Sequence, residues 1–176
     1  MGDWKYTYYA TGQLKTGTDA IKTVTDAKGQ IKSFEYDNKL DRLTKKYVDS
    51  TLQADGTVVH GTLTTSFIFD DCPNGIGRLC HDDTVNNPQL GFMETTTRYT
   101  YDIKGRLISE MKTIEGTRYT TSYAYDSAGR QKEIFYPDSD HEKVTYTYND
   151  AGLLNNVANP QQTYLSSTKY NALRLP

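Results

Sequence analysis

The sequence predicts an all-β protein made of tandem antiparallel β-hairpins that form a curled β-sheet strip. Two observations predict this fold class. The 176 residues include 15 Tyr and 25 Thr against 5 Phe and a single Trp, and Tyr and Thr are side chains that favour strands. A short pattern of two aromatic residues, a turn and Arg also recurs along almost the whole chain, and internal repetition of this kind is typical of repeat architectures.

The repeated pattern is clearest in the second half of the chain, where it reads Tyr-x-Tyr-Asp-x-x-Gly-Arg. The spacings between the second aromatic residues of successive copies are 28, 33, 32, 24, 23 and 22. A period in the low twenties accommodates two strands and two turns, and the longer spacings predict insertions near 53–56 and 85–89. The copies lie at 6–14, 34–43, 67–79, 99–107, 123–130, 146–153 and 170–173.

Each copy is predicted to form a strand, a tight turn and a second strand. The Asp after the second aromatic residue can accept a backbone hydrogen bond and close an Asx-type turn. Three residues later, Gly supplies the positive φ that ends a type I turn with a bulge. The following Arg is expected to pair with the turn Asp or to stack on a Tyr ring. The residues assigned to these structural turns are Tyr36, Asp37, Arg42, Asp70, Gly77, Arg78, Tyr101, Asp102, Gly105, Arg106, Tyr125, Asp126, Gly129, Arg130, Tyr148 and Gly152.

A second set of turn signals, without the Tyr, alternates with the first at 26–29, 54–56, 114–116 and 137–140. This alternation predicts an up-and-down meander. The Tyr residues of a predicted strand share one parity, so one face is expected to be aromatic. The other face is expected to carry polar side chains, with Ser and Thr directed to solvent. Because one Tyr buries about 150–250 Å², a single layer has to curl, stack or wrap around something to cover its aromatic face.

Three copies depart from the pattern. Asp41 stands at the turn Gly position of the second copy and Arg174 at that position of the last, while Leu153 replaces the Arg of the sixth. If position 41 has a positive φ, Gly would suit it better than Asp.

The charge balance and the motif content exclude several functions. The net charge of −2 predicts no nucleic-acid partner. No stretch approaches the roughly 20 apolar residues of a membrane helix, and no signal peptide is visible at the start of the chain. His60, His81 and His141 lack a recognised ligand spacing, and no His and Asp are expected to be placed together so that they activate a Ser or Thr. The sequence therefore predicts no catalytic residue, no cofactor and no metal site.

Cys72 and Cys80 flank a predicted hairpin loop at 73–79. In such a loop the two sulfur atoms could face each other and form a disulfide. The alternative is a pair of free, partly buried thiols. Zinc binding by these cysteines with His81 is disfavoured because the usual paired ligand spacing is missing.

The repeated Tyr-Asp-x-x-Gly-Arg-Leu motif, with Pro-Asn-Gly-Ile-Gly-Arg-Leu at 73–79 inserted in one turn, resembles the bacterial YD-repeat (Rhs) family. That family includes Rhs elements, wall-associated proteins, the shell subunits of insecticidal Tc toxins and, more distantly, teneurins. The resemblance covers nearly all of residues 6–176. It implies a β-strip that spirals into a hollow, cocoon-like shell enclosing a C-terminal toxin domain.

The resemblance also implies how the chain fits into a larger protein. Residues 1–176 would be a single repeat array truncated at both ends, with no toxin domain and no core-ending segment. The partners would be neighbouring repeats of a longer parent chain and its enclosed C-terminal domain, in a secreted or cell-surface protein. An alternative function is a cell-surface adhesion module that binds carbohydrate through exposed Tyr rings.

Overall fold

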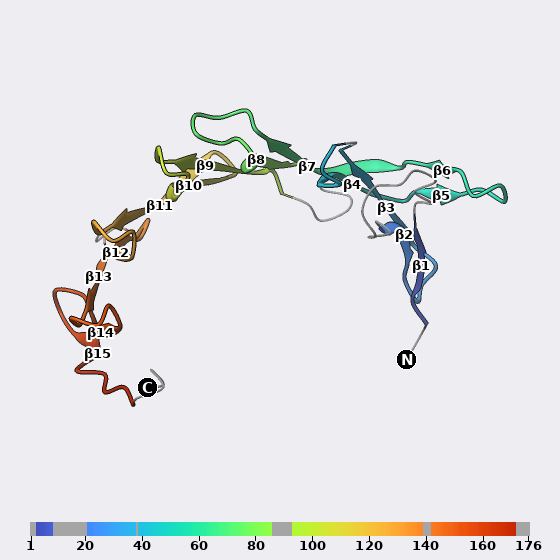
Figure 1. The fold of residues 1–176 in the computed structure, drawn as a ribbon. Helices are drawn as coiled ribbons and strands as arrows, with labels where there is room; N and C mark the ends of the chain where they lie inside the picture. Colours follow the sequence, from blue (N-terminus) through green and yellow to red (C-terminus); the bar gives the residue numbers. More distant parts are fainter. Residues whose placement is uncertain (1–2, 9–20, 38, 86–92, 139–141, 172–176) are drawn as a thin grey trace. The chain divides into compact units, whose positions relative to one another are not determined.

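The structure, a computed structural model, describes residues 3–8, 21–37, 39–85, 93–138 and 142–171. Every regular element within these ranges is a β-strand (Figure 1), which confirms the all-β class. The same ranges contain no helix with the length and apolar character needed to cross a membrane. The partial copy at 6–14, the second insertion and the last copy each fall partly outside the described residues, and Arg174 and His141 lie wholly outside them.

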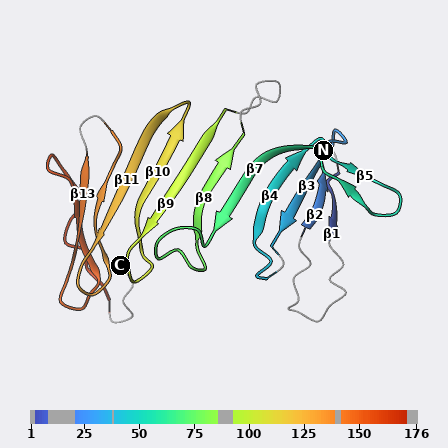
Figure 2. The same cartoon turned by 90° about the horizontal axis from the view of Figure 1, so that it is seen from above.

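The strands form one antiparallel sheet of 13 strands and a separate two-stranded sheet. The order in the large sheet is β1-β2-β3-β4-β7-β8-β9-β10-β11-β12-β13-β14-β15, so its strands follow one another in chain order, as in a meander, and only β5 and β6 are left out, between β4 and β7 (Figure 2). The chain divides into two compact units, which are described separately below. The curl of the strip, its place in a spiral and its status as one truncated array stay predictions.

Unit 1 comprises residues 1–71 and 76–97. Its hairpins are antiparallel, with Glu35 opposite Lys45 in one pair of strands and Phe67 opposite Asp82 in another. The two-stranded sheet β5–β6 is an insertion between β4 and β7, at the site where the spacing predicts one. The strands are β1 (Lys5–Tyr8), β2 (Ile21–Thr25), β3 (Ile31–Tyr36), β4 (Leu43–Val48), β5 (Thr51–Leu52), β6 (Val58–Val59), β7 (Thr62–Phe69) and β8 (Leu79–Thr84).

Unit 2 comprises residues 72–75 and 98–176. Its longest hairpin pairs Ser109 with Ser122 at one end and Ile114 with Thr117 at the other. Glu115 and Gly116 close this hairpin with φ values of 48° and 81°, and two successive positive φ values are what a two-residue type I′ turn requires. The strands are β9 (Thr95–Tyr101, which begins in unit 1), β10 (Leu107–Ile114), β11 (Thr117–Tyr125), β12 (Gln131–Phe135), β13 (Lys143–Tyr148), β14 (Leu154–Ala158) and β15 (Thr163–Leu165).

Few side chains are fully covered. Among the described residues the buried apolar side chains are those of Cys80 and Val144. This is the burial expected of a sheet that has no second layer packed on it.

Several small polar side chains are buried instead. The expectation that Ser and Thr face solvent is wrong for Thr23, Ser33, Ser50, Thr64 and Thr97. A Thr hydroxyl can be buried here because a neighbouring strand offers a carbonyl: Thr64 Oγ1 donates to Lys46 O at 3.1 Å. A buried hydroxyl with such a partner avoids the cost of an unmade hydrogen bond.

The two faces of unit 2 are less distinct than the sequence predicts. On one face Tyr123 stands opposite Ile134, which stands opposite Val144. On the other face Ser122 stands opposite Phe135 and Phe135 opposite Lys143. A large apolar ring, 36% exposed, thus lies on the face expected to be polar.

Candidate functional site

We call the turns that follow the second aromatic residue the motif turns, and those of unit 2 share one hydrogen-bond pattern. In the turn at 102–106, Asp102 N donates to Arg106 O at 2.9 Å and Gly105 N donates to Asp102 O at 2.8 Å. The amides of Lys104 and Arg106 both donate to Asp102 Oδ1 at 2.9 Å. Gly105 has a φ of 72°, the left-handed conformation expected at the end of a type I turn with a bulge.

The same pattern recurs in the next two motif turns. Gly129 N donates to Asp126 O at 3.0 Å, and Arg130 N donates to Asp126 Oδ1 at 2.9 Å. In the following turn Leu153 N donates to Asn149 Oδ1 at 3.0 Å. An Asn side chain therefore closes the turn as well as Asp does, because only one side-chain oxygen is used for it.

The Arg of a motif turn joins its own turn to the next copy. Arg106 Nε and Nη2 lie 2.7 and 2.6 Å from Asp102 Oδ2, and the Arg106 guanidinium lies 4.4 Å from the centre of the Tyr125 ring. Arg130 repeats this arrangement, at 2.7 Å from Asp126 Oδ2 and 4.3 Å from the Tyr148 ring. The Arg can therefore pair with the Asp and stack on an aromatic ring at the same time.

The stacked Tyr is also fixed by its hydroxyl. Tyr125 OH donates to Leu107 O at 2.8 Å, and Tyr148 OH donates to Gln131 O at 2.6 Å. Both acceptors are the residue directly after the motif Arg. Burial raises the pKa of Tyr148, which keeps its hydroxyl protonated as a donor. We call the repeated Asp–Arg–Tyr arrangement the turn ladder.

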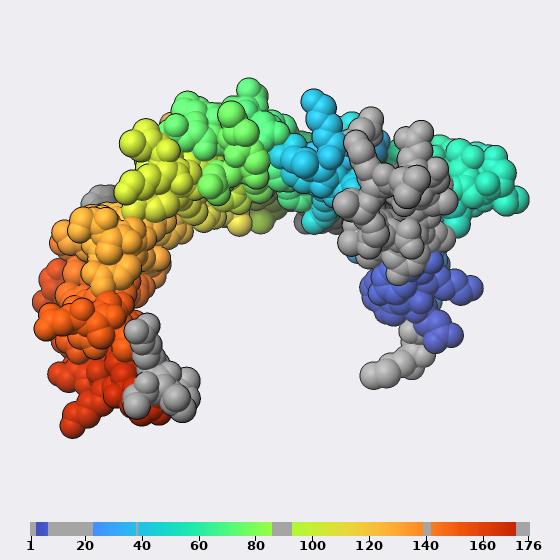
Figure 3. All heavy atoms as spheres, in the orientation of Figure 1, coloured from blue at the N-terminus to red at the C-terminus, as the bar shows by residue number. Residues whose placement is uncertain are grey.

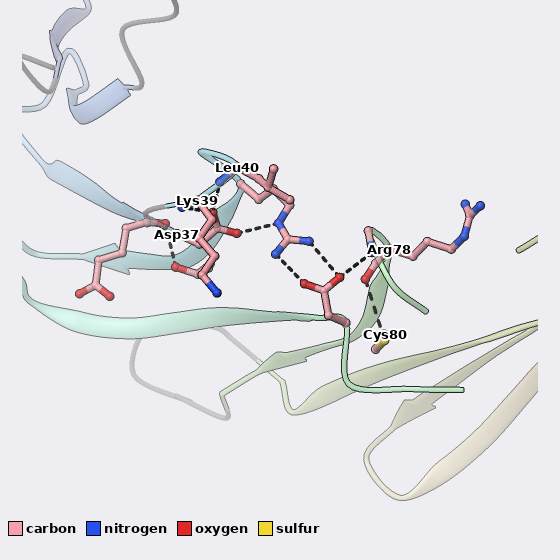
Figure 4. A network of polar contacts seen from close by, with 10 residues as sticks. Asp37, Lys39, Leu40, Arg78 and Cys80 are labelled. Atoms are coloured by element: carbon pink, nitrogen blue, oxygen red, sulfur yellow. Dashed lines mark hydrogen bonds and ion pairs between the residues drawn. The ribbon is translucent and has the colours of Figure 1, made fainter. Parts of the chain in front are cut away.

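Unit 1 contains a variant of the turn ladder. Arg42 Nε lies 2.6 Å from Asp37 Oδ2, and Arg42 Nη2 lies 2.8 Å from Asp70 Oδ2 of the next copy. The Arg42 guanidinium stacks at 4.4 Å on Phe69. Phe69 has no hydroxyl to donate, and here a second ion pair makes the link between copies. In Figure 4 the amides of Lys39 and Leu40 converge on Asp37 in this network.

The sixth copy lacks both charges of the turn ladder. Asn149 takes the place of Asp and Leu153 the place of Arg. The hydroxyl contact nevertheless persists, because Tyr170 OH donates to Leu154 O at 2.6 Å. Tyr170 thus lies in register as the second aromatic residue of the seventh copy.

The turn carboxylates are held in their charged form. The amide of Arg106 lowers the pKa of Asp102, and the guanidinium of Arg42 lowers that of Asp70. For Asp37 and Asp126, burial acts to raise the pKa, but hydrogen bonds from backbone and Arg outweigh it, so both pKa values are lowered. The pKa of Arg42 is raised by its hydrogen bonds to Asp70 and Asp37. These groups are engaged as ion pairs, which is a structural use of charge.

The third motif turn contains the cysteine loop. Both cysteines are disulfide-bonded, and they are the chain's two cysteines, so the bond joins Cys72 to Cys80. Asp70 N donates to Arg78 O at 3.1 Å, and Gly77 N donates to Asp70 Oδ1 at 2.6 Å, which closes the turn across the inserted residues. Figure 4 shows Cys80 beside Arg78 at the end of this loop. Disulfide-bonded sulfurs are not thiolates, and no group of three or more metal-ligating side chains occurs in the described part of the chain.

One polar cluster has no counterpart in the sequence predictions. His60 Nδ1 lies 2.8 Å from Ser33 Oγ, and His60 stacks on Tyr47 with 4.5 Å between ring centres. Ser33 is 0% exposed, so its hydroxyl is closed to a substrate and the cluster is no nucleophilic site. The partners are 27 residues apart, and no local pattern could have paired them.

Comparison with known proteins identifies the family. Residues 81–175, just over half of the chain, match the family model described as the teneurin YD-shell. The chain belongs to the teneurin YD-shell family. The resemblance to YD-repeat proteins is thereby confirmed, and the chain is a YD-shell structural repeat segment. A comparison with curated proteins gave no match.

The YD-shell chain is also similar to parts of solved Tc toxin structures. One is a chain of the TcdB2-TccC3-Cdc42 crystal structure, with 20% identity, a TM-score of 0.48, and coverage of 88% of this chain and 9% of that one. A second belongs to the TcdB2-TccC3 crystal structure, with 13% identity, a TM-score of 0.37, and coverage of 88% and 11%. A third belongs to the Photorhabdus luminescens Tc holotoxin pore, with 13% identity, a TM-score of 0.27, and coverage of 89% and 12%. The YD-shell chain thus spans about a tenth of the solved chains that it resembles.

Proposed function

We propose that this chain is a non-catalytic segment of a β-shell that encloses a C-terminal domain of a longer, secreted or cell-surface protein. The observation that carries the proposal is the turn ladder. Arg42, Arg106 and Arg130 each pair with an Asp of their own turn and stack on an aromatic ring of the next copy. The charged groups of the motif are thereby used to hold successive hairpins in register.

The exposure of the sheet also supports a shell. A sheet with so few buried apolar side chains gains little from a core of its own. Large apolar and aromatic side chains stay exposed on it, among them Tyr119 at 42% and Tyr164 at 49%. A wall is stable when such faces are covered by a further layer or by enclosed chain. Membership of the YD-shell family agrees with this function.

The disulfide supports the proposed location. Cys72 and Cys80 are bonded, and structural disulfides persist in oxidising environments such as the cell surface and the extracellular space. We therefore place the working site of the parent protein outside the reducing cytosol. Retention of the Cys72–Cys80 bond in protein isolated from its native host, under thiol-blocking conditions, would agree with this location. Two free thiols there would contradict it.

Encapsulation is tested on the parent protein. Sequencing on both sides of this segment is expected to reveal further Tyr-Asp-x-x-Gly-Arg turns and then an unrelated C-terminal domain. In that full-length protein, limited proteolysis should spare the C-terminal domain. The double variant Arg106→Leu with Arg130→Leu should expose it to cleavage, while Arg118→Leu, an exposed residue of β11, should not. A reading frame without a further domain, or a C-terminal domain cleaved equally in all three proteins, would overturn the proposal.

The rival function, carbohydrate binding, has one supporting observation, the exposure of Tyr rings such as Tyr119 and Tyr164. Aromatic rings of this kind can stack on sugar rings. Saturable binding of the chain to a glycan array, lost on Tyr119→Ala or Tyr164→Ala, would favour adhesion. Absence of binding at high protein concentration would leave the shell as the better account.

A further inference from the structure

Side chains from both ends of the inserted hairpin meet a buried residue of β3 in unit 1. Ser50 lies just before β5 and His60 just after β6, and this hairpin projects from the unit (Figures 2 and 3). Ser33 Oγ lies 2.6 Å from Ser50 Oγ and 2.8 Å from His60 Nδ1. We call these three residues the hairpin latch. It fastens an insertion to the sheet, and it takes no part in the turn ladder.

The backbone around the hairpin latch is also closely held. Ser50 N donates to Ile31 O at 3.0 Å, and Gly61 N donates to Ser50 Oγ at 3.1 Å. A Cβ on Gly61 would clash with the carbonyl oxygens of Val48 and Asp49. The entry and the exit of the hairpin therefore meet at one place beside β3 and β4.

The hydrogen bonds of the hairpin latch run in one direction when the His60 ring is neutral with its proton on Nε2. The Gly61 amide donates to Ser50, the Ser50 hydroxyl to Ser33, and the Ser33 hydroxyl to His60 Nδ1. Each hydroxyl then donates once and accepts once. All donors in this chain of contacts have an acceptor, which is what burial demands.

A second proton on the His60 ring breaks this arrangement. Nδ1 becomes a donor, so the Ser33 hydroxyl has to turn towards Ser50. Ser50 Oγ then accepts from both Ser33 and Gly61, and among its contacts in the described structure no acceptor is left for its own hydrogen. Ser50 is 7% exposed, so water compensates poorly for the lost bond.

The charged groups around His60 act in opposite directions. Glu35 Oε1 lies 3.5 Å from His60 Nε2 and favours a charged ring. Both oxygens of that carboxylate are already engaged, Oε1 by Tyr47 OH at 2.7 Å and Oε2 by Lys45 Nζ at 3.0 Å. The ammonium of Lys45 itself disfavours a second cation nearby. Reversal of the hydroxyl chain is the effect on which the inference rests.

We infer that the hairpin latch is pH-sensitive: the neutral His60 ring holds the β5–β6 hairpin on the sheet, and protonation releases it. Protonation turns the acceptor nitrogen of the ring into a donor, so release is expected on acidification. The inference goes beyond the proposed shell function. It assigns a conformational response to the inserted β5–β6 hairpin, which lies outside the motif turns.

The test is amide hydrogen exchange of the full chain, followed by mass spectrometry. Exchange of a peptide spanning 51–59, corrected for the intrinsic effect of pH, is expected to speed up about tenfold between about pH 7.5 and about pH 5.5. A peptide spanning 117–125 in β11 serves as internal reference and should show no such change. If the exchange rate of the 51–59 peptide changes with pH only as the intrinsic rate does, the inference is wrong.

Two variants separate His60 from other titrating groups. His60→Gln has no titrating ring, so its hairpin exchange should not respond to pH. His81→Gln, which removes a ring paired with Asp83 at 3.0 Å in β8, should respond like wild type. If His60→Gln does not fold, His60→Asn makes the same test, because it also lacks a titrating ring and should give the same flat response. A pH response retained in the folded His60 variant would refute the pH-sensitive latch.

Discussion

At the motif turns, loss of one charge goes together with loss of the other. Asp126 and Arg130 form a pair at 2.7 Å, whereas the following copy has the neutral Asn149 and Leu153 at the same positions. An Asp without its Arg would keep the turn hydrogen bond but lose the favourable charge interaction, and Asn supplies that hydrogen bond without a charge. The chain therefore contains a natural control for the ion pair.

This control leads to a prediction for Arg130. Arg130→Leu should lower the free energy of unfolding, and loss of the contact with the Tyr148 ring alone accounts for about 0.5–1 kcal/mol. Adding Asp126→Asn to that variant should recover part of the loss, because no unpaired carboxylate then remains. Urea unfolding measures both. Arg118→Leu on β11 is the matched control and should be near wild type, and an equal loss in the control would argue against the turn ladder.

Asp41 tests the turn backbone. It has a φ of 53° at the position where other copies have Gly, so its backbone adopts a conformation that favours glycine. Asp41→Gly is expected to raise the free energy of unfolding by up to about 1 kcal/mol. The converse change, Gly105→Ala at a φ of 72°, should lower it. A lower melting temperature for Asp41→Gly would show that the strain at this turn is compensated by a contact of the carboxylate.

The Asp residues of the turn ladder also predict how stability depends on pH. The pKa values of Asp37, Asp70, Asp102 and Asp126 are lowered in the folded chain. A carboxyl with a lowered folded pKa binds protons more readily when unfolded. Its stabilisation is therefore complete above the unfolded pKa of about 3.9 and is lost as pH falls through the folded value.

Acid titration of the melting temperature measures this dependence. The melting temperature is expected to fall as the pH drops below about 4. In the double variant Asp126→Asn with Arg130→Leu, the fall should be shallower, since one of the shifted carboxyls is gone. If the melting temperature of that variant falls with pH as steeply as that of the wild type, Asp126 contributes nothing to acid unfolding.

At the scale of elements, the motif turns could be predicted from sequence because their contacts are local. The Asp102 turn spans five residues with its hydrogen bonds and ion pair inside it. The hairpin latch could not be predicted in this way. It requires the register that places Ser33 opposite Tyr47, together with an insertion that returns His60 to β3. Burial of Thr64 has the same origin, since its hydroxyl donates to Lys46 O on the neighbouring strand.

The Tyr hydroxyl bond is the contact that ties neighbouring strands at the motif turns. Tyr148 ends β13 and donates to Gln131, the first residue of β12, at 2.6 Å. Tyr148→Phe keeps the ring under Arg130 and removes this bond alone, so it should cost about 0.5–1.5 kcal/mol in urea unfolding. Tyr119→Phe, on a ring that is 42% exposed, is the control. Equal effects of the two changes would mean that the hydrogen bond from Tyr148 to Gln131 adds no stability beyond that of an exposed Tyr hydroxyl.

At the scale of the whole molecule, the large sheet has two edge strands, β1 and β15, in the described strand order. All three residues of β15, Thr163 to Leu165, are exposed. An uncovered strand edge presents unpaired amides and carbonyls, which is a template for pairing with another chain. In the proposed shell, neighbouring repeats of the parent chain would occupy such an edge. The isolated chain has only other copies of itself to offer.

We therefore expect the isolated chain to self-associate through its strand edges. Sedimentation velocity should show a species larger than the 19.9 kDa monomer as the concentration rises. Leu165→Lys should shift the equilibrium towards monomer, because a charged edge strand opposes pairing. Tyr119→Lys places the same charge on β11, an interior strand of the sheet, and should leave the association unchanged if the edge drives it. If the two variants weaken association equally, the chain associates through the faces of the sheet. If the wild type is strictly monomeric, these edges pair only with the parent chain.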